Sequence, residues 1–308
     1  MVKIVIISGP TASHKSHLAE KIRSQINVHS ELVNIDSMQV YNSLPILTAI
    51  PENHAEYHLY AYKKYNEKSS AGIWLEDFEN IRLSRLGKTD VFIVVGGTGL
   101  YIKSLIYGIS EIPNVPREIR LRFLKKFEKS GSEEFFELIK KADPLAAERI
   151  HPSDKQRMIR AMEVYDFTGK SIYSYHEKQK NQDNAQFLHL TILPERDLLY
   201  SNCNRRFDHM LNNGVIEEVK TLKSQINNES DIMVQNALGY KDICSYLDGV
   251  VSLDDAIEKA KQRTRNYAKR QVTWFKGQAE AEKLNFDRFD SRIESEVLQR
   301  VDKFLQIF

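Results

Sequence analysis

The chain begins MVKIVIISGPTASHKS (residues 1–16), and the later elements can be placed around this segment. Residues 4–7, IVII, are an unbroken β-branched run, which is typical of a strand buried on both faces of a parallel sheet. Gly9 and Pro10 end the run, and apolar residues then recur at helical spacing: Leu18, Ala19 and Ile22. The order strand, loop, helix N-terminus predicts a phosphate-binding loop, because loop N–H groups and the helix dipole face an anion there.

This loop follows the pattern G-x-x-x-x-G-K-[ST] at Gly9, Lys15 and Ser16, but His14 stands where the second glycine belongs. In the pattern, the lysine adds a point charge and the serine hydroxyl reaches Mg²⁺. If the loop keeps its usual shape, His14 needs a positive φ. We expect its imidazole to donate a hydrogen bond to the anion, and the protonated ring to bind the anion better than the neutral one. The alternative from these residues alone is a Gly-Pro turn before an ordinary amphipathic helix.

The composition is that of an ordinary globular protein of about two domains. Of the 308 residues 42% are hydrophobic, and 44 Lys and Arg nearly balance 42 Asp and Glu, so an anionic partner must meet a local patch. Cys203 and Cys244 are far apart, which indicates neither a disulfide framework nor a cysteine zinc site and favours a cytoplasmic setting. No run approaches the ~20 apolar residues of a membrane span, and the N-terminal run is too short for a signal peptide. We expect a monomer without a membrane partner.

Two further strands are predicted to end in candidate site residues. A strand through residues 32–35 ends at Asp36, which places a carboxylate at the sheet edge where α/β folds bind ligands; a solvated turn aspartate is the alternative. Residues 90–95, DVFIVV, run into Gly96-Gly97-Thr98-Gly99. Since the dinucleotide spacing G-x-G-x-x-G is not completed, we interpret this as a glycine turn that lets backbone approach a ligand, with Thr98 as a hydroxyl donor. The alternative is a tight turn only.

The predicted secondary structure changes in the middle of the chain. From Pro113 strand patterns stop, and Lys- and Arg-rich helical patterns take over, which predicts a helical insertion. A polar surface loop is expected over residues 177–186, after which FLHLTIL (187–193) indicates a strand that returns to the sheet. Residues 259–279 then form a basic helix interleaved with aromatic residues, suited to a phosphate backbone or to a snorkelling face over the core.

One helix of the insertion carries a distinctive pattern. Ser153 and Gln156 have capping-box spacing, and Gly169 is expected to end the helix. Arg157 and Arg160 are three residues apart and therefore share one face, for which a solvated charged surface is the usual explanation.

With these features in view, the chain resembles the bacterial tRNA dimethylallyltransferases over nearly its whole length. Seven blocks in the same order carry the resemblance: GPTASHKS (9–16), DSMQVY (36–41), VGGTGLY (95–101), VPREIR (115–120), RIHPSDKQRMIRAMEVYDFTGKS (149–171), ALGYKD (237–242) and TRNYAKRQVTWF (264–275).

The resemblance implies an α/β fold, with a P-loop parallel-sheet core and an inserted all-helical domain. The core would comprise residues 1–112 and 187–308, and the tRNA-binding insertion residues 113–186. The implied activity transfers a dimethylallyl group from dimethylallyl diphosphate to the adenine 3′ to the anticodon, with Mg²⁺ as cofactor. The implied partner is the tRNA anticodon stem-loop.

It also implies roles for single residues. Asp36 would take the proton from the adenine amine, and Thr98 would hold the flipped base or its backbone. The residues expected to bind diphosphate are Gly9, Pro10, Thr11, Ala12, Ser13, His14, Lys15, Ser16 and Arg206, with Mg²⁺ on Ser16. The residues expected to contact tRNA are Asp36, Ser37, Met38, Gln39, Thr98, Arg120, Gln156, Arg157, Met158, Ile159 and Arg160.

The sequence departs from the family pattern at two places. His14 replaces the loop glycine, and LTAIP (47–51) stands where members usually have Gly-Thr-Ala-Lys-Pro, so a flexible residue and a cation are lost. Three alternatives stay open at this point. They are a P-loop metabolite kinase that binds ATP in the loop, a prenyltransferase acting on free adenine nucleotides, and a tRNA-binding protein that has lost catalysis.

Overall fold

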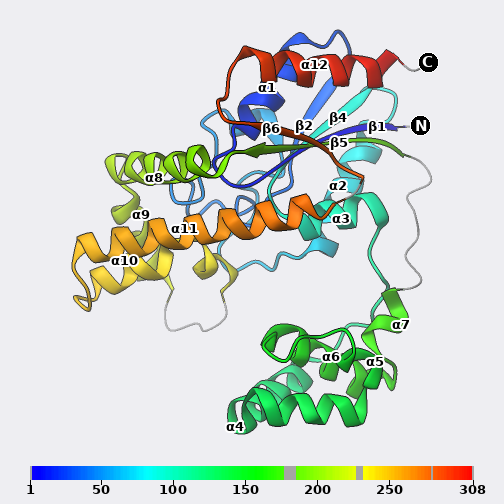
Figure 1. The fold of residues 1–308 in the computed structure, drawn as a ribbon, viewed down its shortest axis with the longest axis vertical. Helices are drawn as coiled ribbons and strands as arrows, with labels where there is room; N and C mark the ends of the chain where they lie inside the picture. Colours follow the sequence, from blue (N-terminus) through cyan, green and yellow to red (C-terminus); the bar gives the residue numbers. More distant parts are fainter. Residues whose placement is uncertain (1, 177–184, 227–231, 279, 307–308) are drawn as a thin grey trace. The chain divides into compact units, whose positions relative to one another are not determined.

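The structure is a computed structural model that describes residues 2–176, 185–226, 232–278 and 280–306 (Figure 1). It divides into two compact units, unit 1 with residues 1–106 and 183–308 and unit 2 with residues 107–182. Most of the polar loop expected over 177–186 lies outside the described residues. Within the described part of the chain, no helix combines the length and the apolar character that a membrane span requires.

Unit 1 is built on one six-stranded sheet in the order β3-β2-β4-β1-β5-β6, and every strand pair in it is parallel. The strands are β1 (Val2–Ser8), β2 (Ser30–Asn34), β3 (Tyr57–His58), β4 (Val91–Gly96), β5 (Ala185–Pro194) and β6 (Glu282–Phe286). The four strands expected from the sequence correspond to β1, β2, β4 and β5, which confirms the predicted fold class. The β-branched run lies in β1, buried between β4 and β5.

Helices cover both faces of this sheet. Because side chains alternate along a strand, β1 contributes Val5 and Ile7 to one layer and Ile4 and Ile6 to the other. The first layer contains α1 (Lys15–Gln25) and α12 (Ser291–Gln306), and the second contains α2 (Ala71–Ser84) and α3 (Gly99–Tyr107) (Figure 1). The remaining helices of unit 1 are η1 (His54–Glu56), α8 (Arg196–Asn212), α9 (Val215–Gln225), η2 (Met233–Asn236), α10 (Tyr240–Leu247) and α11 (Leu253–Lys276).

The predicted basic helix is α11, and two of its basic residues form ion pairs. Lys261 contacts Asp208 at 2.6 Å, and Arg263 contacts the buried Asp242 at 3.3 Å. The opposite side of the helix forms a buried stripe at helical spacing: Ala256, Ala260, Thr264, Ala268, Gln271 and Phe275. One side of α11 therefore packs against the core of unit 1.

Among the described residues of unit 2, all regular secondary structure is helical. It consists of α4 (Arg117–Ala142), which is interrupted at Gly131, α5 (Pro144–Ala147), α6 (Lys155–Thr168) and α7 (Ile172–His176). Gly169 ends α6 in a left-handed conformation, as expected. The predicted capping box is wrong: Asp154 is the N-cap and accepts from the Arg157 N–H, while the Ser153 hydroxyl contacts His151. Asp154 is one residue nearer the helix, and its carboxylate also complements the helix dipole.

Candidate active site

The predicted phosphate-binding loop has the expected geometry. Residues 9–14 connect the carboxyl end of β1 to the N-terminus of α1. Gly9 has a φ of +150°, and a Cβ at this position would lie 2.4 Å from the backbone oxygen of Ile192 in β5. Only glycine therefore lets the loop leave the sheet here.

His14 has the positive φ that its place in the pattern predicted. Its φ is 64° and its ψ is 21°, and Nε2 of its ring accepts from Asn202 Nδ2 at 3.3 Å. Burial lowers the pKa of His14, and the neighbouring cations His17, Arg205 and Lys15 lower it further. Because Nε2 acts as an acceptor, the expectation of a protonated imidazole is not supported, whereas donation from Nδ1 to the anion stays a prediction.

Two partly buried cations adjoin the loop. Lys15 Nζ donates to the backbone oxygen of Pro10 at 2.6 Å, and the Arg206 guanidinium, on α8, donates to the Thr11 hydroxyl. Burial lowers the pKa of Lys15 to about 8, against the opposing effect of Asp36. Burial likewise lowers the pKa of Arg206. Buried cations that lack full hydration gain strongly from an added anion, so this is a suitable place for a phosphate group.

Asp36 follows β2 and is held by its neighbours. The buried Asn34 accepts from the Asp36 N–H at 2.9 Å and donates to the Leu59 carbonyl at 2.9 Å. Thr98 Oγ1 accepts from the Ser37 N–H at 3.0 Å, and its hydroxyl donates to Ser37 Oγ at 3.3 Å. The structure thus places Thr98 as a support for residues 36–37.

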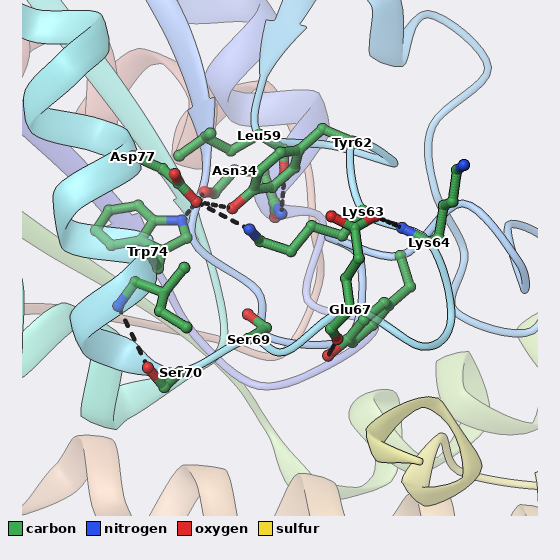
Figure 2. Close-up of polar contacts among 12 residues, drawn as sticks. Asn34, Leu59, Tyr62, Lys63, Lys64, Glu67, Ser69, Ser70, Trp74 and Asp77 are labelled. Carbon is green, nitrogen blue, oxygen red and sulfur yellow. Dashed lines mark hydrogen bonds and ion pairs between the residues drawn. The ribbon is translucent and has the colours of Figure 1, made fainter. Parts of the chain in front are cut away.

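The loop of residues 59–64, which follows β3, is tied to α2 by polar contacts (Figure 2). Asp77 lies between Lys63, at 3.2 Å from Nζ, and the Tyr62 hydroxyl, which donates to it at 2.5 Å (Figure 2). Trp74 Nε1 donates to the Asn34 backbone oxygen at 2.9 Å. Leu59 has a φ of 64°, so these contacts fix a strained turn beside the end of β2.

The glycine turn after β4 lies against α11. A Cβ on Gly97 would lie 2.6 Å from Gln271 Nε2, and one on Gly99 would lie 2.7 Å from the Trp274 ring. At these two positions the close neighbour is a helix, but Gly96 and Gly97 also line the cavity beside the phosphate-binding loop, so the interpretation that this turn approaches a ligand stays a prediction. Gln271 joins the two turns, since it accepts from the Thr11 N–H and donates to the Gly97 carbonyl, both at 2.8 Å.

Sequence reasoning missed Gln271, although a signal for it exists. Gln271 is an uncharged polar residue within the apolar stripe of α11, and it is 7% exposed. A polar side chain at a core-facing position has to find partners inside the fold. The same signal applies to Asn202, which lies on the buried side of α8 beside Leu199 and Cys203.

Two neighbouring cavities share Asp36 and Arg206, and Thr98 lines neither of them. A cavity of about 300 Å³ is lined by residues 11–17, by Asp36 and by Arg206, among others. A second cavity, of about 390 Å³, again touches Thr11, Asp36 and Arg206, but many of its walls are apolar: Met38, Leu47, Cys203, Phe207, Met210, Met233, Ala237 and Leu238. Tyr267 and Arg270 of α11 also line it. Asp36 and Arg206 thus border both a polar and a largely apolar space.

Gln39, which was expected to contact tRNA, makes internal hydrogen bonds. Gln39 Nε2 donates to the carbonyls of Thr48 and Ala49, both at 2.9 Å. From the other side, the Glu218 carboxylate accepts from the Ile46 and Leu47 N–H groups at 2.7 and 2.8 Å. Residues 46–49, within the stretch that departs from the family pattern, are therefore held by internal contacts.

In unit 2, five expected RNA-contact residues line one cavity of about 550 Å³: Arg120, Gln156, Arg157, Ile159 and Arg160. Glu163 lies among them, 2% exposed, 3.1 Å from Arg160 and 4.0 Å from Arg120. Met158 and Ile159 are 0% and 4% exposed and belong to the core of the unit. The Met158 side chain supports this face and does not form its surface, which corrects its place among the expected contacts, whereas Ile159 also lines the cavity and stays a predicted contact.

The donor set at Ser16 fits the expected Mg²⁺. The Ser16 hydroxyl and the Asp36 carboxylate line the same cavity, and oxygen donors are those that Mg²⁺ prefers. Tyr60 hydrogen-bonds to Ser16 and would orient its hydroxyl. In the described part of the chain no cluster of three or more His, Cys, Asp or Glu side chains could hold an ion. The site therefore suits an ion held largely by diphosphate oxygens and water.

Comparison with known proteins gives one consistent family. The family model described as IPP transferase matches residues 39–278. A tRNA dimethylallyltransferase of Ehrlichia canis is 39% identical over 282 residues, covering 90% of this chain and 93% of the relative. One of Rickettsia conorii is 41% identical over 283 residues, covering 89% and 77%.

Solved structures agree. The tRNA isopentenylpyrophosphate transferase of Bacillus halodurans has a TM-score of 0.70 and 30% identity, covering 99% of this chain and 97% of that one. A eukaryotic dimethylallyltransferase acting on tRNA has a TM-score of 0.79 and 28% identity, covering 98% and 78%. The chain therefore belongs to the IPP transferase family, the family of the tRNA dimethylallyltransferases.

Proposed function

We propose that this protein transfers a dimethylallyl group from dimethylallyl diphosphate to N6 of the adenine 3′ to the anticodon in tRNA, releasing diphosphate. The observation that carries the proposal is the shared border of the two cavities. One carboxylate and one buried guanidinium face both a phosphate-binding loop and a largely apolar space. Such a border suits a reaction between a diphosphate ester with an apolar tail and an amine.

The loop residues would hold the diphosphate. The N–H groups of residues 12–16 and the N-terminus of α1 supply donors and a positive field, while Lys15 and Arg206 supply full charges. As the carbon–oxygen bond to the diphosphate breaks, negative charge grows on the leaving oxygen. Cations that are already in place stabilise that charge without reorganisation. Bound at Ser16, Mg²⁺ would neutralise part of the same charge.

Asp36 would accept the proton. The adenine N6 forms a bond to the prenyl carbon, the carbon–oxygen bond to diphosphate breaks, and one N6 proton passes to the carboxylate. The carboxylate can act as a general base because the amine becomes acidic as its new bond forms. Asn34 and the Met38 N–H, which donates to Asp36 Oδ1 at 2.9 Å, hold this residue in place.

The adenine has to leave its stack to reach a buried electrophile, and a loop base makes that extrusion cheaper. The exposed arginines of unit 2 support tRNA as the acceptor, because guanidinium groups bind phosphates well. Arg157 is 73% exposed and Arg160 is 38% exposed. The proposal assigns both to the RNA backbone.

One assay tests the proposal against its alternatives. The protein is incubated with dimethylallyl diphosphate and Mg²⁺ in the presence of tRNA, AMP or ATP, and each product is examined for a gained prenyl group. We expect transfer to tRNA only. Transfer to AMP or ATP would support a nucleotide prenyltransferase, phosphorylation of a small metabolite by ATP would support a kinase, and tRNA binding without transfer would support a catalytically inactive binder.

A further inference from the structure

The phosphate-binding loop contains two residues in a conformation that side chains disfavour. Ala12 has a φ of 61° and His14 a φ of 64°. Both carry a Cβ, which crowds the backbone in the left-handed region, whereas glycine enters that region freely. A loop of this shape persists only if its surroundings hold it.

A single amide contacts both strained residues. Asn202 Nδ2 lies 3.2 Å from the Ala12 carbonyl oxygen and 3.3 Å from His14 Nε2. Arg205 donates to Asn202 Oδ1, which fixes the orientation of the amide. Asn202 itself is 7% exposed, so this contact is an internal one.

An aromatic ring from the C-terminal part of the chain covers the other side of His14. The Phe289 ring stacks on the imidazole, with centroids 4.5 Å apart and planes 17° apart. The helix that follows is tied to α1, since Glu294 contacts His17 at 2.8 Å and Lys21 at 3.8 Å. Phe289 therefore precedes a helix, α12, that is held against α1, the helix that follows the loop.

We propose that Asn202 and Phe289 are positioning residues that hold the loop of residues 9–16 in its anion-binding shape, doing through side-chain contacts what a glycine at position 14 would do by conformational freedom. The inference rests on the proposed role of this loop in binding diphosphate. His14 takes part as a neutral ring, because Nε2 must accept from Asn202 while its face lies on Phe289.

The test measures binding of inorganic diphosphate with Mg²⁺ to the full chain, by calorimetry, for Phe289→Leu. This change keeps apolar volume but removes the ring stack, and we expect Kd to rise about three- to tenfold. The matched control is Phe304→Leu, because Phe304 lies on α12 and packs in the sheet core without contact to His14. Its Kd should stay within about twofold of wild type.

The decisive arm is a double-mutant cycle with His14→Gly. Glycine needs no support, so Phe289→Leu should change Kd by less than about twofold in the His14→Gly background. Asn202→Ala should keep part of its effect there, since its contact to the Ala12 carbonyl remains. In the transfer assay Phe289→Leu should raise KM for dimethylallyl diphosphate and leave kcat at saturation nearly unchanged.

Equal effects of Phe289→Leu in both backgrounds would overturn the inference, as would a similar loss with Phe304→Leu, which would indicate general destabilisation. Normal diphosphate affinity in Phe289→Leu would overturn it too. These outcomes leave the proposed function standing. Absence of diphosphate binding by the wild-type protein would instead overturn the proposed role of the loop, and the inference with it.

Discussion

The cations of the phosphate-binding loop and those of the α6 face in unit 2 contrast in burial. Lys15 and Arg206 are partly buried, and each donates to a residue of the loop. Arg157 is 73% exposed, and its partner is Asp154 at the start of its own helix. The buried pair is therefore fixed before any ligand arrives, whereas the exposed arginine remains able to follow a flexible polyanion.

This contrast has a physical consequence. Charges enclosed by protein interact through a low effective dielectric and are little affected by salt, while exposed charges are screened within about 10 Å at 0.1 M salt. The loop should thus govern the geometry of a small anion and the rate of reaction. The α6 face should govern an affinity that depends on salt.

The largest expected effect comes from Asp36→Asn. We expect the transfer rate to fall by about 10² to 10⁴, because the amide cannot take the amine proton, while tRNA and diphosphate affinities stay nearly intact. Single-turnover rates and separate binding measurements check this. Asp290→Asn, at a partly exposed carboxylate next to Arg292, is the control. Near-normal turnover in Asp36→Asn would exclude Asp36 as the base.

A second, smaller effect should appear in the pH dependence of ligand affinity. The pKa of Lys15 in the free protein lies at about 8, so the ammonium that attracts diphosphate is lost as pH rises through this value. Affinity for dimethylallyl diphosphate should then fall by about tenfold from pH 8 to pH 9.5. Lys15→Arg should flatten the profile, since arginine stays charged, and it also corrects for ionisation of the ligand. A wild-type profile as flat as that of Lys15→Arg would mean that the charge of Lys15 does not govern affinity for the diphosphate.

The smallest effect concerns the exposed face. Arg157→Gln should weaken tRNA binding by about two- to threefold and reduce the salt slope of log Kd by about 0.7, the value for one single-stranded phosphate contact. Arg292→Gln is the matched control, because Arg292 is 80% exposed and paired with Asp290. Arg160 is less suitable, since its loss would leave the buried Glu163 without its closest cation. An unchanged slope would mean that Arg157 only faces solvent.

Much of the fold could be predicted because its signals are local. Residues 4–7 and 90–95 are β-branched or apolar runs that end at glycine, and both became strands that meet a loop and a helix at the same sheet edge. The α6 helix was also predictable from its spacing, but its N-cap was not. Ser153 and Asp154 are both good N-caps, and a one-residue shift depends on the path of the preceding chain.

The sequence by itself determined the strand–loop–helix junctions, the place of Asp36 after β2 and the positive φ of His14, because each follows from a few neighbouring residues. Only the tertiary structure decided what holds them. Gln271 contacts Thr11 across 260 positions of sequence, and Asn202 contacts His14 across 188. No local pattern specifies such partners, since they meet only when α8 and α11 pack against the sheet and a buried polar group must be satisfied by whatever lies beside it.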